Sequence, residues 1–199
     1  MNIEAAKLSL HMSPLIAVLL LLQTGPSHGF PPGAPRSGLE AGPVFIHFDA
    51  ALGAEDGLVQ GVEAAFRMSL VTEEFTLGTR FWYRQWDLKF EELNQAPADL
   101  DAEAQQIGLD ITVGYPLAPP FSAGLAFGGG AMILEHDNDR EVAPVFEVGP
   151  FARLDLLGLL YVEAGGMLQF SMTDFGGQDT DSDHISWAGR ISLGFEIGF

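Results

Sequence analysis

The sequence contains no cysteine and few cations, and after residue 22 it has no apolar run long enough for a membrane helix. Without cysteine there is no disulfide framework, no thiol nucleophile and no thiol for a lipid anchor. Lys and Arg number 9 against 27 Asp and Glu, and the formal net charge of -18 argues against a nucleic acid partner. The hydrophobic fraction is nevertheless 47%. A membrane protein of this composition has to span with strands.

The N-terminal region carries one apolar segment, at residues 14–22, with Lys7 before it and Ser27 and Gly29 after it. The segment is shorter than the roughly 20 residues of a membrane helix. The small residues two positions apart suit a cleavage site, so the segment predicts a signal peptide. The predicted division of the chain is a signal peptide at 1–29, a Pro/Gly-rich flexible segment at 30–42 and one domain at 43–199.

Turn signals divide the domain into eight segments that read as strands of roughly ten residues or slightly more. At residues 107–115 every odd position is large and apolar and every even position is small or polar, and most segments alternate in the same way. The predicted strands are 44–50, 61–70, 76–90, 105–117, 121–134, 145–156, 159–172 and 185–199.

Long and short connections alternate between these strands. The connections at 53–57, 91–103, 135–144 and 173–184 are longer and acidic, whereas those at 72–74, 118–120 and 157–158 are tight. In an antiparallel barrel with an even number of strands, all long connections then lie at one end and both termini lie at the other. A soluble sandwich has no reason to sort its loops in this way.

Charged residues gather on the face opposite the apolar stripe of the strands. Arginine suits such an interior because its fork pairs with two carboxylates, and an Arg or Lys facing lipid at mid-membrane costs roughly 2 to 4 kcal/mol. The only strand lysine, Lys89, lies at a strand end. The predicted inner ion network consists of Asp49, Glu63, Arg67, Arg80, Arg84, Asp110, Glu147, Arg153, Asp155, Glu163, Arg190 and Glu196.

Aromatic residues mark both ends of the predicted strands, as two interfacial girdles would. Trp82, Tyr83, Trp86 and Trp187 lie toward one end, and Tyr115, Phe121 and Phe199 lie toward the other. Trp82 and Trp86 share the parity of Arg80 and Arg84. They therefore either stack on these guanidinium groups inside the barrel or a bulge turns that half of the strand outward.

The last nine residues, 191–199, place a large apolar side chain at every odd position and end on Phe199. This pattern resembles the closing strand of bacterial outer-membrane β-barrels, and the whole of 41–199 looks like a small barrel of the OmpA or OmpX kind. The resemblance implies an all-β fold, an eight-stranded antiparallel up-and-down transmembrane barrel in outer-membrane lipid, with its short turns and both termini on the periplasmic side. It further implies a monomer whose Phe195, Ile197 and Phe199 form the signal for the barrel-assembly machinery. A peptidoglycan-binding domain after the barrel is not expected.

An eight-stranded barrel is only wide enough for side chains to fill its interior. We therefore expect a lumen closed by ion pairs and a non-enzymatic protein with a structural or surface-interaction role. Two alternatives stay open at this point: a narrow channel for small solutes or ions, and a secreted soluble barrel that binds a small ligand.

Four weaker patterns concern sites. Asp179, Asp181 and Asp183 are spaced as in a calcium loop, but the glycine and the glutamate of that loop are missing, so a divalent cation is a minor expectation and no other cofactor is expected. The same reasoning applies more weakly to residues 137–139. Sequence positions 184–186, His-Ile-Ser, resemble the His-x-Ser element of outer-membrane lipid A deacylases. The same-face Glu196 lies too far along the strand to orient the histidine, so a loop acid such as Asp174 would have to do so. His47, beside Asp49, is expected on the inner face, most simply as a hydrogen-bonded structural residue, and the small residues 122, 124, 126, 128 and 130 are expected to clear space for long side chains opposite.

Overall fold

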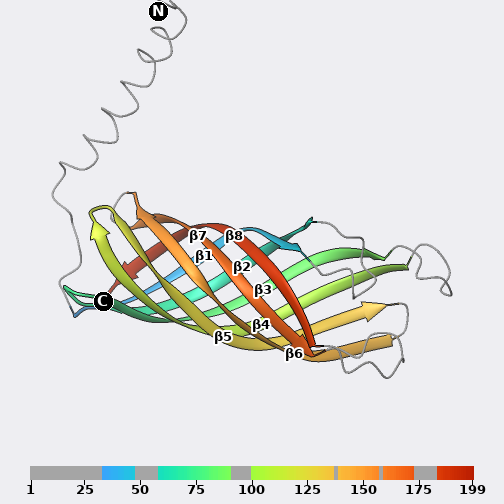
Figure 1. Ribbon diagram of the computed structural model, residues 1–199. Helices are drawn as coiled ribbons and strands as arrows, with labels where there is room; N and C mark the ends of the chain where they lie inside the picture. The colour runs from blue at the N-terminus through green and yellow to red at the C-terminus, as the bar shows by residue number, and fades with distance from the viewer. Residues whose placement is uncertain (1–32, 48–57, 91–99, 137–138, 157–158, 173–182) are drawn as a thin grey trace, which may run out of the picture.

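The computed structural model describes residues 33–47, 58–90, 100–136, 139–156, 159–172 and 183–199, and these form a closed antiparallel barrel in which each strand pairs with the next and β8 pairs with β1 (Figure 1). The eight strands are β1 (Pro35–His47), β2 (Leu58–Val71), β3 (Thr76–Phe90), β4 (Leu100–Ala118), β5 (Phe121–His136), β6 (Asp139–Asp155), β7 (Leu160–Met172) and β8 (Asp183–Gly198). The predicted fold class and strand order are therefore confirmed.

Among the described residues, no helix has the length and apolar character that a membrane-crossing helix needs.

The first strand begins earlier than the sequence analysis placed it. β1 starts at Pro35, so residues 35–42 belong to the barrel wall and not to a flexible segment, which corrects the predicted start at 44. The proline and glycine content of this segment predicted flexibility, because both residues are depleted in strands. Here Gly38 and Gly42 face backbone of β8 so closely that an added Cβ would lie 2.5 Å from the carbonyl oxygen of Phe195 and 1.9 Å from that of Ile191.

Tight connections gather at one end of the barrel, which we call the turn end, and the opposite end is the loop end (Figure 1). At the turn 72–75 the Thr72 Oγ1 accepts hydrogen bonds from the backbone N–H groups of Glu74 (3.3 Å) and Phe75 (3.0 Å), a side-chain cap typical of turns.

The expected long connection at 135–144 is wrong, because β5 runs to His136 and β6 begins at Asp139, with these two residues paired. At the loop end β4, β5 and β6 consequently extend as paired strands where a loop was predicted.

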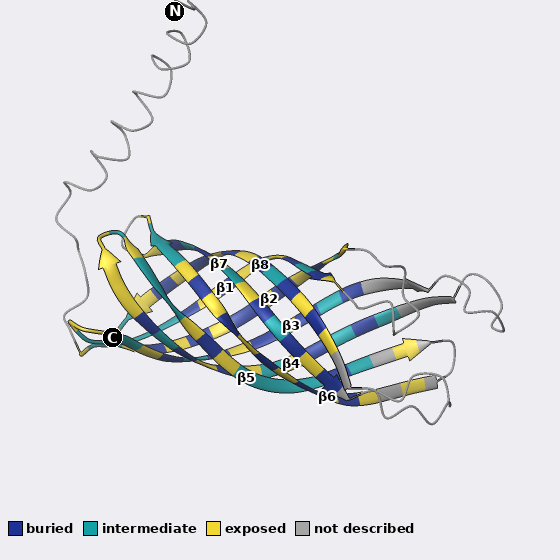
Figure 2. Ribbon diagram, in the orientation of Figure 1, coloured by how far each residue is buried: buried dark blue, intermediate teal, exposed yellow. Residues whose placement is uncertain are grey.

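Side chains alternate between a buried inner face and an exposed outer face along most strands, whereas the glycine-rich β5 has mostly intermediate exposure (Figure 2). The outward residues are large and apolar, and Leu109 and Ile111 keep 37% and 38% of their surface exposed. Arg67 and Glu163 are buried inside the barrel. This distribution is the reverse of that in a water-soluble protein, in which most large apolar side chains are buried and charged side chains almost never are.

The inner and outer faces of β1 are the opposite of those predicted from the sequence. Glu40 faces inward, and because side chains alternate with period two, Val44 and Ile46 follow it into the interior, where both are buried. His47 is exposed on the opposite face, paired with Trp187 of β8, so the expected inner position of His47 is wrong. Asp49, expected beside it, lies outside the described residues.

Inner aromatic rings lie over glycines of the neighbouring strand. Tyr161 pairs with Gly194 and Trp82 pairs with Gly108, and a Cβ added at either glycine would come within 2.1 Å and 2.3 Å of the ring. Phe151 and Gly124 make a third such pair, at 2.7 Å. Glycine on the inner face of β5 is thus needed for close approach, as the small residues of that strand predicted.

Candidate functional site

A chain of ion pairs crosses the barrel interior. Its central link is Arg80, which donates hydrogen bonds to the carboxylates of Glu40 and Glu63 and so joins β1, β2 and β3. The side chains of all three residues are buried. Four carboxylates and four arginines alternate along the whole chain, in the order Glu147, Arg84, Glu63, Arg80, Glu40, Arg67, Glu163 and Arg190.

Arg84 is the most fully bonded cation of this chain. Its Nη1 and Nη2 bind both oxygens of Glu147 at 2.5 and 2.9 Å, and its Nε donates to Glu63 at 2.6 Å. The bidentate fork joins β3 to β6 across the lumen, a geometry that arginine but not lysine provides. Gln169 of β7 donates to the same Glu147 at 2.8 Å, so the carboxylate accepts three hydrogen bonds from two side chains.

Glu40 is a central network residue that the sequence analysis did not predict. It accepts bonds from Arg80, from Arg67 at 3.4 Å and from the Tyr161 hydroxyl at 2.8 Å, and it thereby connects β1 to β2, β3 and β7. The signal was present, because Leu39, Glu40 and Ala41 continue the apolar and polar alternation of β1 toward the N-terminus. Glu40 was not assigned to the network because the predicted domain began only at residue 43.

A second cluster lies at the turn end. Arg153 donates to Asp155 at 2.8 Å and to Glu196 at 2.7 Å, and its guanidinium lies 3.8 Å from the centroid of the Tyr161 ring. Glu196 also accepts a bond from Ser69 at 3.0 Å, and its carboxylate lies 3.6 Å from Arg36, an arginine that was not predicted in the network. Asp155 is the least buried member, with an intermediate exposure.

The structure thus brings together every predicted network residue that it describes. Asp110 joins more loosely, with its carboxylate 3.5 Å from an Arg80 nitrogen. Asp49 lies outside the described residues. The largest contributions that the prediction lacked are Glu40, Arg36 and the uncharged partners Tyr161 and Gln169.

Trp82 and Trp86 point into the barrel and are buried there. The Arg84 guanidinium lies 4.1 Å from the centroid of the Trp82 ring, within cation–π range. The pairing of β3 with β4 runs from Thr76 to Phe90 without a register shift, so the bulge alternative is excluded. Neither tryptophan belongs to an outer girdle at the loop end, whereas Tyr83 and Trp187 do face outward.

An apolar layer covers the charged interior toward the loop end. On β1, β3, β4 and β6 the buried residues that follow the charged ones in this direction are Val44, Ile46, Trp86, Ala104 and Val145. Met132 of β5 and Ala188 of β8 pack in the same cluster. The interior is therefore filled both by ion pairs and by closely packed apolar side chains.

The weaker site predictions gain no support from this geometry. Asp179 and Asp181 lie outside the described residues, Asp183 begins β8, and no group of three metal-ligating side chains occurs within the described part of the chain. Ser186 is buried inside the barrel, opposite Gln169. Glu196, the acid on its face, is bonded to Arg153 and Ser69 at the other end of the strand.

The sequence matches no family model and no curated protein, but solved structures share its fold. Neisserial surface protein A is 12% identical with a TM-score of 0.51, and the alignment covers 83% of this chain and 97% of that one. The Ail attachment invasion locus protein of Yersinia pestis, solved with the heparin analogue sucrose octasulfate, is 12% identical with a TM-score of 0.53, covering 82% and 99%. A major outer membrane protein from Thermus thermophilus is 12% identical with a TM-score of 0.50, covering 82% and 100%. The chain therefore has the fold of the small eight-stranded outer-membrane β-barrels.

Proposed function

We propose that this protein is a monomeric, non-enzymatic outer-membrane barrel whose lumen is closed and whose role is structural or one of surface interaction. The observation that carries the proposal is the interior itself. Arg84 and Arg80 together bind carboxylates from β1, β2 and β6, and an eight-stranded barrel has little room beyond its own side chains. We therefore expect solutes to find no continuous water-filled path through the interior that the described strands enclose.

The proposed orientation places the turn end and both termini in the periplasm and the loop end outside the cell. Short turns on the periplasmic side and longer connections outside are the rule for bacterial barrels of this type. A cleaved signal peptide at residues 1–29 and recognition of Phe195, Ile197 and Phe199 by the barrel-assembly machinery belong to the same proposal. The long connections at the loop end are rich in Asp and Glu, so the surface that the protein presents outside is acidic.

The acidic loop end limits the kind of partner. Sucrose octasulfate, the heparin analogue in the Ail structure, is a polyanion, whereas this chain has a formal net charge of -18. Like charges repel across an interface and reduce the rate of encounter. We therefore expect this protein to select neutral or cationic partners and not sulfated polysaccharides.

Two measurements test the proposal. After membrane fractionation, a closed barrel is expected in the outer membrane and should migrate differently in gel electrophoresis before and after boiling. In planar bilayers the wild-type protein is expected to give no discrete conductance steps. Steps in the wild type that change in Arg84→Ala would instead establish the channel alternative, and recovery in the soluble fraction would establish the secreted one.

A further inference from the structure

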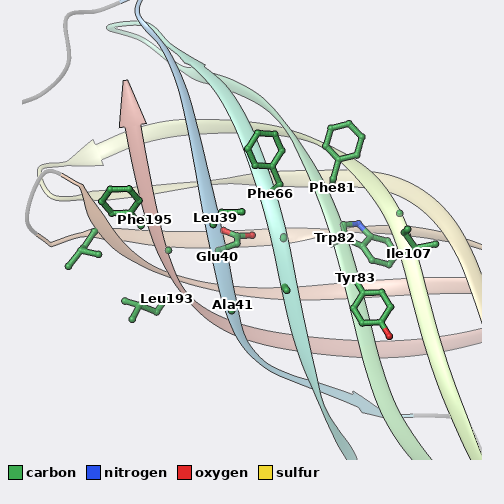
Figure 3. Close-up of a pocket in the computed structure, with 15 residues that line it drawn as sticks. Leu39, Glu40, Ala41, Phe66, Phe81, Trp82, Tyr83, Ile107, Leu193 and Phe195 are labelled. Atoms are coloured by element: carbon green, nitrogen blue, oxygen red, sulfur yellow. The ribbon is translucent and has the colours of Figure 1, made fainter. Parts of the chain in front are cut away.

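A hollow of about 690 Å³ opens on the outward wall of the barrel (Figure 3). Its floor is formed by Ala41 of β1 and Ala64 of β2, which are directly paired across the two strands. Leu193 of β8 and Tyr83 of β3 continue the same row on either side. The hollow exists because two methyl groups stand where the neighbouring strands carry large side chains.

The walls of the hollow are aromatic and fixed by pairing. Phe66 and Phe81 are cross-strand partners on β2 and β3 and stand side by side above the floor (Figure 3). Tyr83 closes one side, with its hydroxyl donating to Gln85 at 3.2 Å, and Phe195 borders the hollow from β8. Paired aromatic residues with few accessible rotamers make a rigid groove, which orders a ligand at low entropic cost.

The outward side chains of the hollow offer no charge to a ligand. Glu40 and Trp82 also border it but are buried on the inner face, where the Glu40 carboxylate is bound by Arg67, Arg80 and Tyr161. The one polar group on the outer side is the Tyr83 hydroxyl. A phosphate, a sugar or a cation would lose its hydration here without compensation, so the ligand has to be apolar.

The position of the hollow along the strands shows which part of a lipid can reach it. Ala41 is six residues from each end of β1, which runs from Pro35 to His47. At about 3.3 Å per residue and the usual strand tilt, the floor lies roughly 15 Å below either rim of the wall. The polar head of a lipid anchored at either rim therefore stays outside, and only hydrocarbon reaches the site.

We propose that this hollow binds an acyl chain of a membrane lipid and retains it more tightly than the rest of the wall does. The proposal rests on the proposed membrane location, because it extends the apolar outer wall that lipid covers. A second copy of the protein fits less well. Two convex cylinders touch along a line, whereas a stable protein interface buries about 1,200–2,000 Å².

Photolabelling tests the proposal with the intact chain folded into phospholipid vesicles. The probe is a phosphatidylethanolamine with a diazirine near the methyl end of one acyl chain, present at low mole fraction. After irradiation, labelled positions are mapped by mass spectrometry. We expect label on β1, β2 and β3 around the hollow to exceed label on the outward faces of β5 and β6.

Filling the floor supplies the matched comparison. The larger side chain of Ala64→Leu fills the floor and removes the contacts of about two methylene groups of the acyl chain. Labelling at the hollow should therefore fall about tenfold. Ala164→Leu makes the same change at an exposed outward alanine of β7 that does not line the hollow, and labelling should stay at the wild-type level. Should Ala64→Leu not fold, Ala41→Leu fills the same floor from β1.

The outcomes separate this proposal from the proposed function. Even labelling around all eight strands, or labelling unchanged in Ala64→Leu, would mean ordinary lipid contact and would overturn the proposal while leaving the membrane location intact. Crosslinks between two copies that disappear in Ala64→Leu would overturn it in favour of a dimer. Failure of the wild-type protein to enter vesicles, seen by extraction with carbonate, would overturn the proposed membrane location itself.

Discussion

Replacing Arg84 by methionine removes the cation that ties β3 to β6 while keeping most of the volume of the side chain. The change deletes three charge-assisted hydrogen bonds, at 2.5 and 2.9 Å to Glu147 and at 2.6 Å to Glu63. Both carboxylates stay buried. Glu63 keeps Arg80 as a partner, but Glu147 is left with the neutral amide of Gln169.

The expected loss in the free energy of unfolding follows from this uncompensated charge. Removing one member of a buried pair costs about 3–5 kcal/mol, and loss of the contact between Arg84 and Trp82 adds about 0.5–2 kcal/mol. We expect Arg84→Met to lose about 4 kcal/mol, a large part of the about 5–15 kcal/mol that stabilises a typical protein. Arg140→Met is the control, because its pair with Glu135 is 3.4 Å long and largely exposed, and such pairs contribute about 0–1 kcal/mol.

Urea titration of the protein in lipid vesicles measures this loss, with the folded fraction read from migration of unboiled samples. The double variant Arg84→Met with Glu147→Gln removes both charges. We expect Glu147→Gln to cost about 2 kcal/mol less in the Arg84→Met background than in the wild type, because coupling between directly bonded residues is about 0.5–3 kcal/mol. A loss below about 1 kcal/mol in Arg84→Met, or strict additivity in the double variant, would refute the reasoning that the lumen is held by paired ions.

Three further predictions concern other parts of the wall. Gly194→Val places side-chain atoms against the Tyr161 ring, which an added Cβ would approach to 2.1 Å, and should cost about 1–3 kcal/mol in the same titration, with partial recovery in a Tyr161→Ala background. Leu109→Arg, midway along the outward face of β4, should cost about 2–4 kcal/mol, whereas Tyr115→Arg near the turn end should cost about 0–1 kcal/mol; equal losses would contradict a lipid-covered wall. Quenching of tryptophan fluorescence by brominated lipid should be lost largely in Trp187→Phe, because the other two tryptophans are buried in the interior; undiminished quenching would contradict this placement.

The alternation along the strands could be predicted from the sequence, because it depends only on which face of the strand is buried. At Leu109 and Asp110 one face meets an apolar surrounding and the other a polar interior, so the alternation is strict and the register follows. The tight turn at 72–75 and the limits of β3 were likewise predictable, since turn residues interrupt the alternation on both sides. The network residues then followed from parity, without knowledge of which acid meets which arginine.

The sequence was less informative where two signals conflicted. At residues 35–42 proline and glycine argued against a strand, although close backbone approach to β8 is the reason that Gly38 and Gly42 are there. At Val44 and Ile46 apolar character argued for the outside, but these residues pack in an apolar layer above the ions. The cross-lumen partners of Glu40 also depend on barrel shear, which sets distances between strands that are far apart in sequence.

The ion chain has a consequence for how the protein enters a membrane. Glu147 meets its arginine from the opposite side of the ring, and Glu163 on β7 is bonded to Arg67 on β2. Glu163 also has Arg190 of the neighbouring β8 as a partner, but no strand adjacent to β6 supplies the arginine that is bonded to Glu147. A partly inserted sheet that lacks β3 would therefore expose the Glu147 carboxylate to hydrocarbon. The complete set of pairs exists only in the closed ring, so we expect ring closure and membrane insertion to be coupled.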